Sequence, residues 1–310
     1  MERRIDPDVP QRFGNLELLS RQVVEGFITG LHKSPFHGFS VEFAEHRIYN
    51  PGESTRYIDW KLYARTEKLF VKRLEEETNL RCHIVLDNSS SMYFPGYGLS
   101  GEHPTKIGFS VECAAALALL LRKQRDAVGI TILSDKTELH TPAKSNIVHH
   151  KMLFTELEKL YHKPNHTLNK RTNTAELLHH LAEKIHKRSL VIIFSDLMDN
   201  TARPGDVFSA LQHLRHNKHE VILFHVYEKH KEADFDYDNR PYKFVDMETG
   251  QEMKLNPADI RRDYTRKLKE FHNQVKLKCM QYRIDFVPAE INQGYNNVLM
   301  PFLVKRSKLH

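Results

Sequence analysis

From residue 80 to the end of the chain, short apolar runs alternate with longer segments of helical periodicity, and this alternation most limits the possible folds. The apolar runs include CHIVLD at 82–87, SLVIIFSD at 189–196 and EVILFHVYE at 220–228, with helical patterns at 105–126 and 206–217. Strands without polar alternation are buried on both faces, as in parallel sheets covered by helices. The pattern predicts an α/β fold with a doubly wound, mostly parallel sheet flanked by helices.

Two regions with different patterns meet at about residue 78. Residues 1–78 hold an amphipathic helical pattern at 16–31 and a strand- and turn-rich segment at 35–75. Residues 79–310 carry the strand–helix alternation, with a β-hairpin insertion near 242–254. A lone hairpin is marginally stable in water. We therefore expect strands at 39–49 and 69–75 to join the 242–254 hairpin in one small accessory sheet.

The sequence predicts no membrane span and no secretion signal. Its longest strongly apolar stretch, 113–121, is about half of what crosses a bilayer. The first residues, MERRIDPDVPQRF, lack the apolar region of a signal peptide. We expect a cytoplasmic protein.

The net charge of +6 permits acidic partners. Much of the excess lies at 261–278, where Tyr264, Leu268 and Phe271 fall on one helical face and the basic residues fill the other. This pattern favours a solvated helix face, because no aromatic residues interleave on the basic side. Basic nucleic-acid binding stays open as an alternative function.

Polar residues directly follow two of the predicted buried strands. Asp87, Ser89 and Ser91 end the first apolar run, and Asp196 ends the run at 189–196. Carboxyl ends of parallel strands share one edge of a sheet, where ligands bind near a switch in strand order. Alternate residues of an extended segment point to one side, so Asp87 and the two serines face together. These oxygens are hard donors that suit Mg²⁺ or Mn²⁺.

A loop residue, Thr172, completes the set. Asn173 and Glu176 have capping-box spacing, which predicts a helix start there and leaves Thr172 just outside it, at the same sheet edge. The expected metal-site residues are Asp87, Ser89, Ser91, Thr172 and Asp196.

Other oxygen-rich motifs do not fit this segment. An EF-hand loop that begins at Asp87 would need glycine at position 92 and glutamate at position 98, where the chain has Met92 and Gly98. Neither a phosphate-binding P-loop nor the G-x-S-x-G turn of hydrolases occurs in the sequence.

The arrangement resembles the metal-ion-dependent adhesion site of von Willebrand factor type A domains. Asp87-x-Ser89-x-Ser91, Thr172 in RTNT and Asp196 in FSD match that site in order and in strand context. The resemblance covers about 80–230. It implies that the hydroxyls line the metal, that the aspartates bind it directly or through water, and that an acidic residue of a partner protein completes the octahedron.

The upstream segment EFAEHRIYNPGESTRYIDWKLYARTEKLFVKRLEEET, 42–78, resembles the signature of the family called domain of unknown function 58, which precedes a type A domain. Glu53 stands where that family commonly has aspartate. The matching residues that we take as a family signature or partner surface are Tyr49, Pro51, Gly52, Arg56, Asp59, Trp60 and Arg65. An alternative interpretation is a structural seam, with Asp59 paired to an arginine and Trp60 as an anchor.

The resemblance implies a partner class as well as a fold. Genes of this family commonly neighbour MoxR-type AAA+ ATPases, and the pair is thought to mature or assemble other proteins. Many members resemble membrane proteins with two N-terminal spans, which this chain lacks. We therefore expect a metal-dependent protein–protein interaction module, an adaptor for such an ATPase.

We do not expect an enzyme, because no histidine or free glutamate lies beside the metal-site residues in the sequence. The alternative is a magnesium-dependent hydrolase, in which Asp199 or Asp196 activates a metal-bound water.

Overall fold

The computed structural model describes residues 16–17, 20–21, 24–25, 42–50, 52, 54–55, 58–75, 80–96, 105–162, 174–198 and 205–308. The chain divides into two units, Phe36–Leu80 and the remainder, Met1–Pro35 with Arg81–His310.

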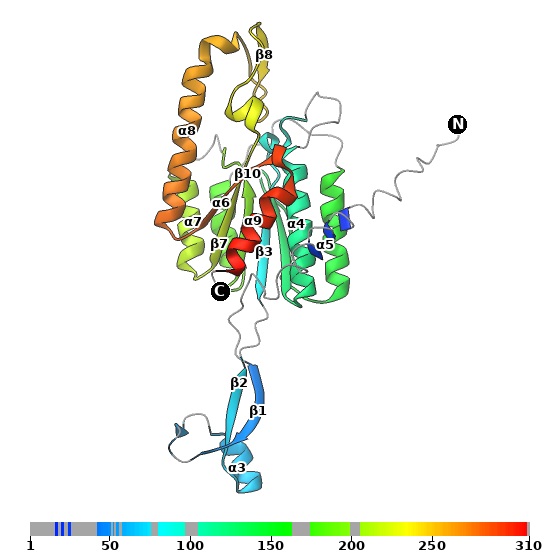
Figure 1. The fold of residues 1–310 in the computed structure, drawn as a ribbon, viewed down its shortest axis with the longest axis vertical. Coiled ribbons are helices and arrows are strands. Elements are labelled where there is room, and N and C mark those ends of the chain that lie inside the picture. The colour runs from blue at the N-terminus through cyan, green and yellow to red at the C-terminus, as the bar shows by residue number, and fades with distance from the viewer. Residues whose placement is uncertain are drawn as a thin grey trace, which may run out of the picture. The chain divides into compact units, whose positions relative to one another are not determined.

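The larger unit is built on a six-stranded sheet in the order β10-β7-β6-β3-β4-β5 (Figure 1). Its strands are β3 (Arg81–Asp87), β4 (Ala127–Leu133), β5 (Thr137–His140), β6 (Leu190–Ser195), β7 (Glu220–Tyr227) and β10 (Asp285–Glu290). All neighbours pair in parallel except β5, which pairs antiparallel with β4. This mostly parallel α/β sheet confirms the predicted fold class.

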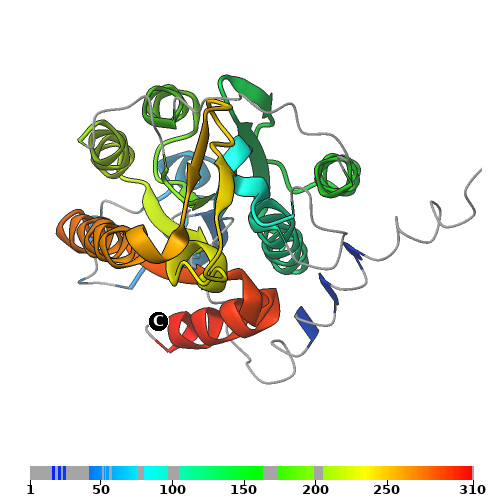
Figure 2. The same cartoon turned by 90° about the horizontal axis from the view of Figure 1, so that it is seen from above.

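Helices cover both faces of the sheet (Figure 2). One face is covered by α6 (Thr174–Lys184), α7 (Asp206–His216) and α8 (Pro257–Gln281). The other is covered by α4 (Lys106–Lys123) and α9 (Tyr295–Ser307), and α5 (Ile147–Tyr161) packs beside α4. Because both faces are covered, the central strands β3, β6 and β7 are buried along almost their whole length.

Alternation along the strands divides the core in two. Val191 and Leu223 face the α6–α8 side, where they pack with Leu178 and Val275. On the other side, the ring of Phe224 stacks on Phe194 at 4.6 Å and meets Phe302 of α9 edge-on. Helix α4 is buried along most of its length, which accounts for its continuous apolar run.

The predicted single accessory sheet is wrong. β8 (Tyr242–Val245) and β9 (Glu252–Leu255) pair only with each other among the described residues, and β1 (Glu42–Ile48) and β2 (Phe70–Glu75) form a separate two-stranded sheet. Each two-stranded sheet has its own neighbouring residues or elements. Phe244 of β8 stacks on Phe235, and the smaller unit adds the helix α3 (Trp60–Thr66).

Short helical turns complete the fold: η2 (Ser90–Tyr93), η3 (Lys229–Ala233) and η4 (Ile291–Gln293). In the part of the chain that the structure describes, none of the helices has both the length and the apolar character that crossing a membrane requires.

Candidate metal centre

The strand order reverses direction between β3 and β6, at the centre of the sheet. The chain passes from β3 through α4 to β4 on one side, and β6 is followed by β7 on the other. Such a switch point leaves a crevice at the carboxyl ends of the two strands. Asp87 is the last residue of β3, and Asp196 directly follows β6. The fold therefore places both carboxylates beside the switch point.

Asp87 is held by two hydrogen bonds that fix its orientation. Its Oδ1 accepts from the backbone N–H of Ser89 at 2.9 Å, and its Oδ2 accepts from the hydroxyl of Ser195 at 2.6 Å. The Ser195 hydroxyl in turn accepts from the N–H of Leu197 at 2.9 Å. Burial, followed by the nearby charge of Asp196, raises the pKa of Asp87 to about 6 despite these hydrogen bonds. The ionised form of Asp87 is therefore disfavoured where no cation offsets its charge.

The two serines lie together beside Asp87. The Oγ atoms of Ser89 and Ser91 are 3.0 Å apart, and Ser89 is almost fully buried. The intervening Asn88 points away, because its amide donates to Glu138 of β5 and accepts from the hydroxyl of Tyr93. The two serine hydroxyls therefore lie together, although Ser91 belongs to the short helical turn Ser90–Tyr93 and not to the predicted extended segment.

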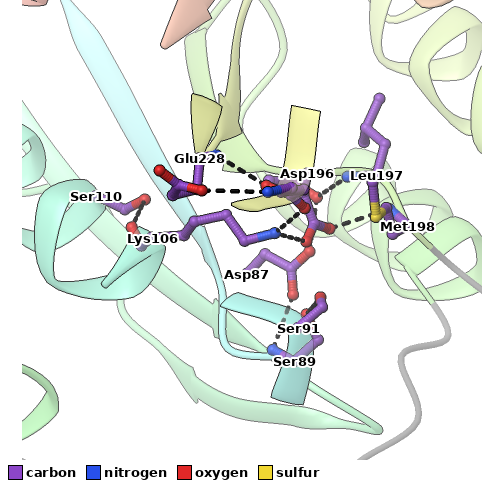
Figure 3. Close-up of polar contacts among 11 residues, drawn as sticks. Asp87, Ser89, Ser91, Lys106, Ser110, Asp196, Leu197, Met198 and Glu228 are labelled. Carbon is purple, nitrogen blue, oxygen red and sulfur yellow. Dashed lines mark hydrogen bonds and ion pairs between the residues drawn. The ribbon is translucent and has the colours of Figure 1, made fainter. Parts of the chain in front are cut away.

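Asp196 sits in a strained stretch of backbone. Its Oδ1 accepts from the N–H of Met198 at 3.0 Å, and a hydrogen bond from Ser91 also reaches its carboxylate. Between them Leu197 has a φ of 55°, a left-handed conformation that non-glycine residues rarely adopt. This turn directs the Asp196 carboxylate toward Asp87 and the serines (Figure 3).

Lys106 and Glu232 complete the cluster, and sequence reasoning missed both. The Lys106 ammonium lies 2.8 Å from Oδ2 of Asp196 and 2.6 Å from Oε1 of Glu232, and its side chain is 1% exposed. Figure 3 shows Lys106 reaching from α4 toward Asp196. Lys106 occupies a position on the buried face of α4, in line with Ser110 and Cys113. The sequence could have indicated Lys106, because it is a charged residue at a position that the helical pattern assigns to the buried face.

The charges in this cluster are unevenly balanced. Burial alone would lower the pKa of Lys106, but the charges of Asp196 and Glu232 raise it above its ordinary value. Burial would raise the pKa of Asp196, yet the charge and hydrogen bond of Lys106 lower it. Burial raises the pKa of Glu232 although Lys106 opposes this. Lys106 therefore remains charged and stabilises the ionised form of Asp196.

Glu232 is anchored by the turn that carries it. Its Oε2 accepts from the backbone N–H of Glu228 at 2.8 Å. The carboxylate of Glu228 accepts from the N–H groups of His230, Lys231 and Glu232, which caps η3. Each of the two glutamates thus accepts a hydrogen bond from the backbone N–H of the other, in the manner of a capping box. No sequence pattern linked Glu232 to the site, because Lys106, its partner there, lies 126 positions away along the chain.

These residues fit a hard divalent cation. Among the described residues no three histidine, cysteine or carboxylate side chains form a group that could hold a metal. A cation here would therefore need the serine hydroxyls as well as Asp87 and Asp196. The 3.0 Å between the Ser89 and Ser91 hydroxyls is close to the ~2.9 Å between adjacent ligands of Mg²⁺ with bonds of about 2.0–2.1 Å. Three carboxylates against one ammonium also leave negative charge for a cation to neutralise.

An apolar groove of about 880 Å³ begins at the cluster. Ser91, Lys106 and Glu232 line one part of it, and the groove continues between α8 and the β8–β9 hairpin. Several aromatic side chains line it: Phe94, Phe208, Phe235, Tyr237, Phe244, Tyr264 and Phe271. A ligand that reached the cluster would contact these rings.

Two predicted residues lie outside the described part of the chain. Thr172, expected as the third hydroxyl, and Asp199, the carboxylate of the hydrolase alternative, fall in the gaps at 163–173 and 199–204. The structure therefore brings together Asp87, Ser89, Ser91 and Asp196 of the predicted set.

The signature residues belong to the smaller unit. Tyr49 donates its N–H to the carbonyl of Leu69, and Gly52 has a φ of 98°, which requires glycine. Asp59 caps α3 by accepting from the N–H groups of Lys61 and Leu62. Pro51 and Arg56 lie outside the described residues.

Two signature side chains are exposed. Trp60 is 60% exposed and meets Tyr63 edge-on, while Arg65 points into solvent and donates to the carbonyl of Lys61. Within the smaller unit, both side chains therefore lie on the surface of one short helix.

Residues 45–274 match the family model described as protein of unknown function DUF58. Uncharacterized proteins of Mycobacterium bovis and Mycobacterium tuberculosis are 26% identical to the chain over 265 residues, which is 84% of this chain and 78% of theirs.

The chain is also similar to solved structures at low sequence identity. The conserved hypothetical protein BatB from Bacteroides thetaiotaomicron is 13% identical, with a TM-score of 0.44 and coverage of 74% of this chain and 99% of that one. The SpRpn10 VWA domain is 10% identical, with a TM-score of 0.34 and coverage of 48% and 76%.

Proposed function

The chain belongs to the DUF58 family of proteins of unknown function, and on this premise we propose that its larger unit is a metal-dependent protein-interaction module. In this proposal a divalent cation, Mg²⁺ or Mn²⁺, is held at the carboxyl ends of β3 and β6. The bound cation binds an acidic side chain of a partner protein. The observation that carries the proposal is the convergence of Asp87, Ser89, Ser91 and Asp196 at the switch point.

The neutral serines and the charged aspartates have different roles in the proposed site. Ser89 and Ser91 offer neutral oxygens, so a bound cation keeps enough positive charge to attract a carboxylate from outside. Ser195 and the N–H of Ser89 hold the Asp87 carboxylate in place. The N–H of Met198 does the same for Asp196. When bound, the cation would supply a position for the partner's carboxylate oxygen.

The apolar groove supports a protein as the ligand. A small acidic metabolite would use only the cluster, whereas a peptide segment would also place side chains along the groove. We propose that the partner presents an acidic residue next to apolar or aromatic residues, which pack against Phe244 and Phe271. Burying such side chains contributes most of the affinity in protein interfaces.

We propose binding rather than hydrolysis because the described carboxylates are already engaged. Asp196 accepts from Lys106 and from the N–H of Met198, and Glu232 accepts from Lys106 and from the N–H of Glu228. A general base needs a free oxygen directed at the water that it activates. The family resemblance supports a MoxR-type AAA+ ATPase as the partner and an adaptor role in the maturation of other proteins.

The test compares metal binding with partner capture. Mn²⁺ binding is measured by electron paramagnetic resonance for the wild type, Asp87→Asn, Ser89→Ala and the control Asp135→Asn. Asp135 follows β4 at the neighbouring strand end and accepts from the hydroxyl of Ser134. Capture of a MoxR-type ATPase from the same cell is then measured in Mg²⁺ and in EDTA, with melting curves alongside.

We expect Asp87→Asn and Ser89→Ala to weaken Mn²⁺ binding and capture at least tenfold, and Asp135→Asn to match the wild type. Absence of Mn²⁺ binding at millimolar concentration in the wild type would reject the metal site. Undiminished capture in EDTA would show that the metal is not the contact.

A further inference from the structure

We propose that Lys106 is a built-in counter-cation that competes with the divalent metal for Asp196 and thereby sets the metal affinity of the site. This inference rests on the proposed metal site and adds how that site is regulated. The observation is the position of the ammonium, 2.8 Å from Oδ2 of Asp196 in a side chain that is 1% exposed.

Competition follows from the charges. A divalent cation bound among Asp87, Ser89, Ser91 and Asp196 would lie within a few ångströms of the Lys106 ammonium. Two positive charges at that distance repel strongly where little water screens them. Both oxygens of Asp196 already accept a hydrogen bond, Oδ2 from Lys106 and Oδ1 from the N–H of Met198, so a cation that binds Asp196 competes with these donors. We therefore expect a bound metal to weaken the contact between Lys106 and Asp196.

Glu232 gives Lys106 a second place to stay. The ammonium is 2.6 Å from Oε1 of Glu232, whose other oxygen is fixed by the N–H of Glu228. A lysine is a compact charge on a flexible stem with three donors, so it can turn toward Glu232 without moving its backbone. The backbone of Lys106 stays in place because its N–H donates to the carbonyl of Phe94 at 3.1 Å.

The arrangement couples the metal to the partner. Without metal, Lys106 stabilises the buried carboxylates, so the fold does not depend on a cation. A divalent metal that binds alone places two positive charges next to the Lys106 ammonium, and this repulsion weakens the binding of the metal. A partner carboxylate that binds the metal offsets part of this charge, so metal and acidic partner should each raise the affinity for the other.

The test measures Mn²⁺ dissociation constants and melting temperatures for the full chain. The variants are Lys106→Met, which removes the charge at similar length, and Lys106→Gln, which keeps a hydrogen-bond donor. The matched control is Lys231→Met, because Lys231 lines the same groove but donates to the carbonyl of Asp236.

We expect Lys106→Met and Lys106→Gln to bind Mn²⁺ at least tenfold more tightly than the wild type, and Lys231→Met to match the wild type. Lys106→Met should melt at a lower temperature in EDTA and recover in Mn²⁺, because the cation replaces the missing charge. If Lys106→Met does not fold even in Mn²⁺, the Mn²⁺ dissociation constant of Lys106→Gln decides whether the lysine competes with the metal.

The outcomes separate this inference from the proposed function. Unchanged Mn²⁺ affinity in the Lys106 variants, with a wild type that binds, would overturn the competition and leave the metal site intact. Mn²⁺ binding by the variants alone would support the competition and overturn the metal-dependent function of the wild type. Absence of binding in all of them would overturn both.

Discussion

Ser195 is a small buried side chain that holds two parts of the site together. Its hydroxyl donates to Oδ2 of Asp87 at 2.6 Å and accepts from the N–H of Leu197 at 2.9 Å. Through these contacts Ser195 positions one carboxylate and stabilises the left-handed backbone beside the other.

We predict that Ser195→Ala lowers the free energy of unfolding by about 1–3 kcal/mol, since it leaves a buried donor and a buried acceptor unpaired. Urea denaturation measures this change. The control is Ser110→Ala, whose hydroxyl donates to a carbonyl within its own helix and is equally buried. Such a bond adds little to helix stability, so equal losses for both variants would contradict the positioning role of Ser195.

His83 is a buried histidine on β3 that is neutral in the folded protein. Its side chain is 3% exposed, and its Nε2 has no hydrogen-bond partner within the described structure. Burial, followed by the charges of His140 and His219, lowers the pKa of His83 to about 3. The unfolded chain, with a pKa near 6.5, therefore binds a proton in acid that the folded protein does not.

We predict that His83 makes the protein less stable as the pH falls from about 6.5 toward 3. In this window the unfolded state gains the proton, so His83 contributes a loss of up to about 1.4 kcal/mol per pH unit. His83→Phe should reduce the slope of unfolding free energy against pH by up to this amount. Denaturation at pH values from 7 to 4.5 measures the slope, and an unchanged slope would show that His83 is protonated in the fold.

At the scale of elements, the side chain of His83 in β3 packs directly against Gly129 in β4. Gly129 of β4 pairs with His83 of β3 in the register of the sheet. A Cβ on Gly129 would lie 2.6 Å from Cε1 of His83 and 2.6 Å from the backbone carbonyl oxygen of Thr141. The carbonyl cannot turn aside as a flexible side chain can. The strand therefore needs glycine at this position.

We predict that Gly129→Ala destabilises the protein by about 1–3 kcal/mol through overpacking. The control is Gly205→Ala at the start of α7, because a Cβ there meets no heavy atom within 4 Å. Thermal unfolding of both variants, followed by circular dichroism, makes the comparison. Similar melting temperatures for the two variants would show that β3 and β4 tolerate the added methyl group.

At the scale of the whole molecule, the sequence predicted the sheet because its strands are continuous apolar runs of β-forming residues. CHIVLD and SLVIIFSD became β3 and β6, which lie side by side with both faces covered. The accessory strands were misjudged because short alternating segments specify a hairpin but not its neighbours. Phe235, which stacks on Phe244 of β8, comes from a segment without a periodic pattern.

The site residues that come directly after strands could be predicted from the sequence. The residues that reach the site only through tertiary contacts could not. Asp87, Ser89, Ser91 and Asp196 could be placed together because parallel strands end at one edge. Lys106 and Glu232 are joined across 126 positions, and no local pattern links them. Lys106 is the first residue of α4, whose other buried residues are mostly apolar.

The long separations among Lys106, Asp196 and Glu232 also have a consequence for the kinetics of folding. The two ion pairs join residues 90 and 126 positions apart, and they require β3, β6 and β7 to be in place first. Contacts of such high contact order form late, after the cost of closing the chain has been met. Interactions that are absent from the transition state act on the rate of unfolding and hardly on the rate of folding. The charged cluster should therefore slow the unfolding of the native state and leave the rate of folding almost unchanged.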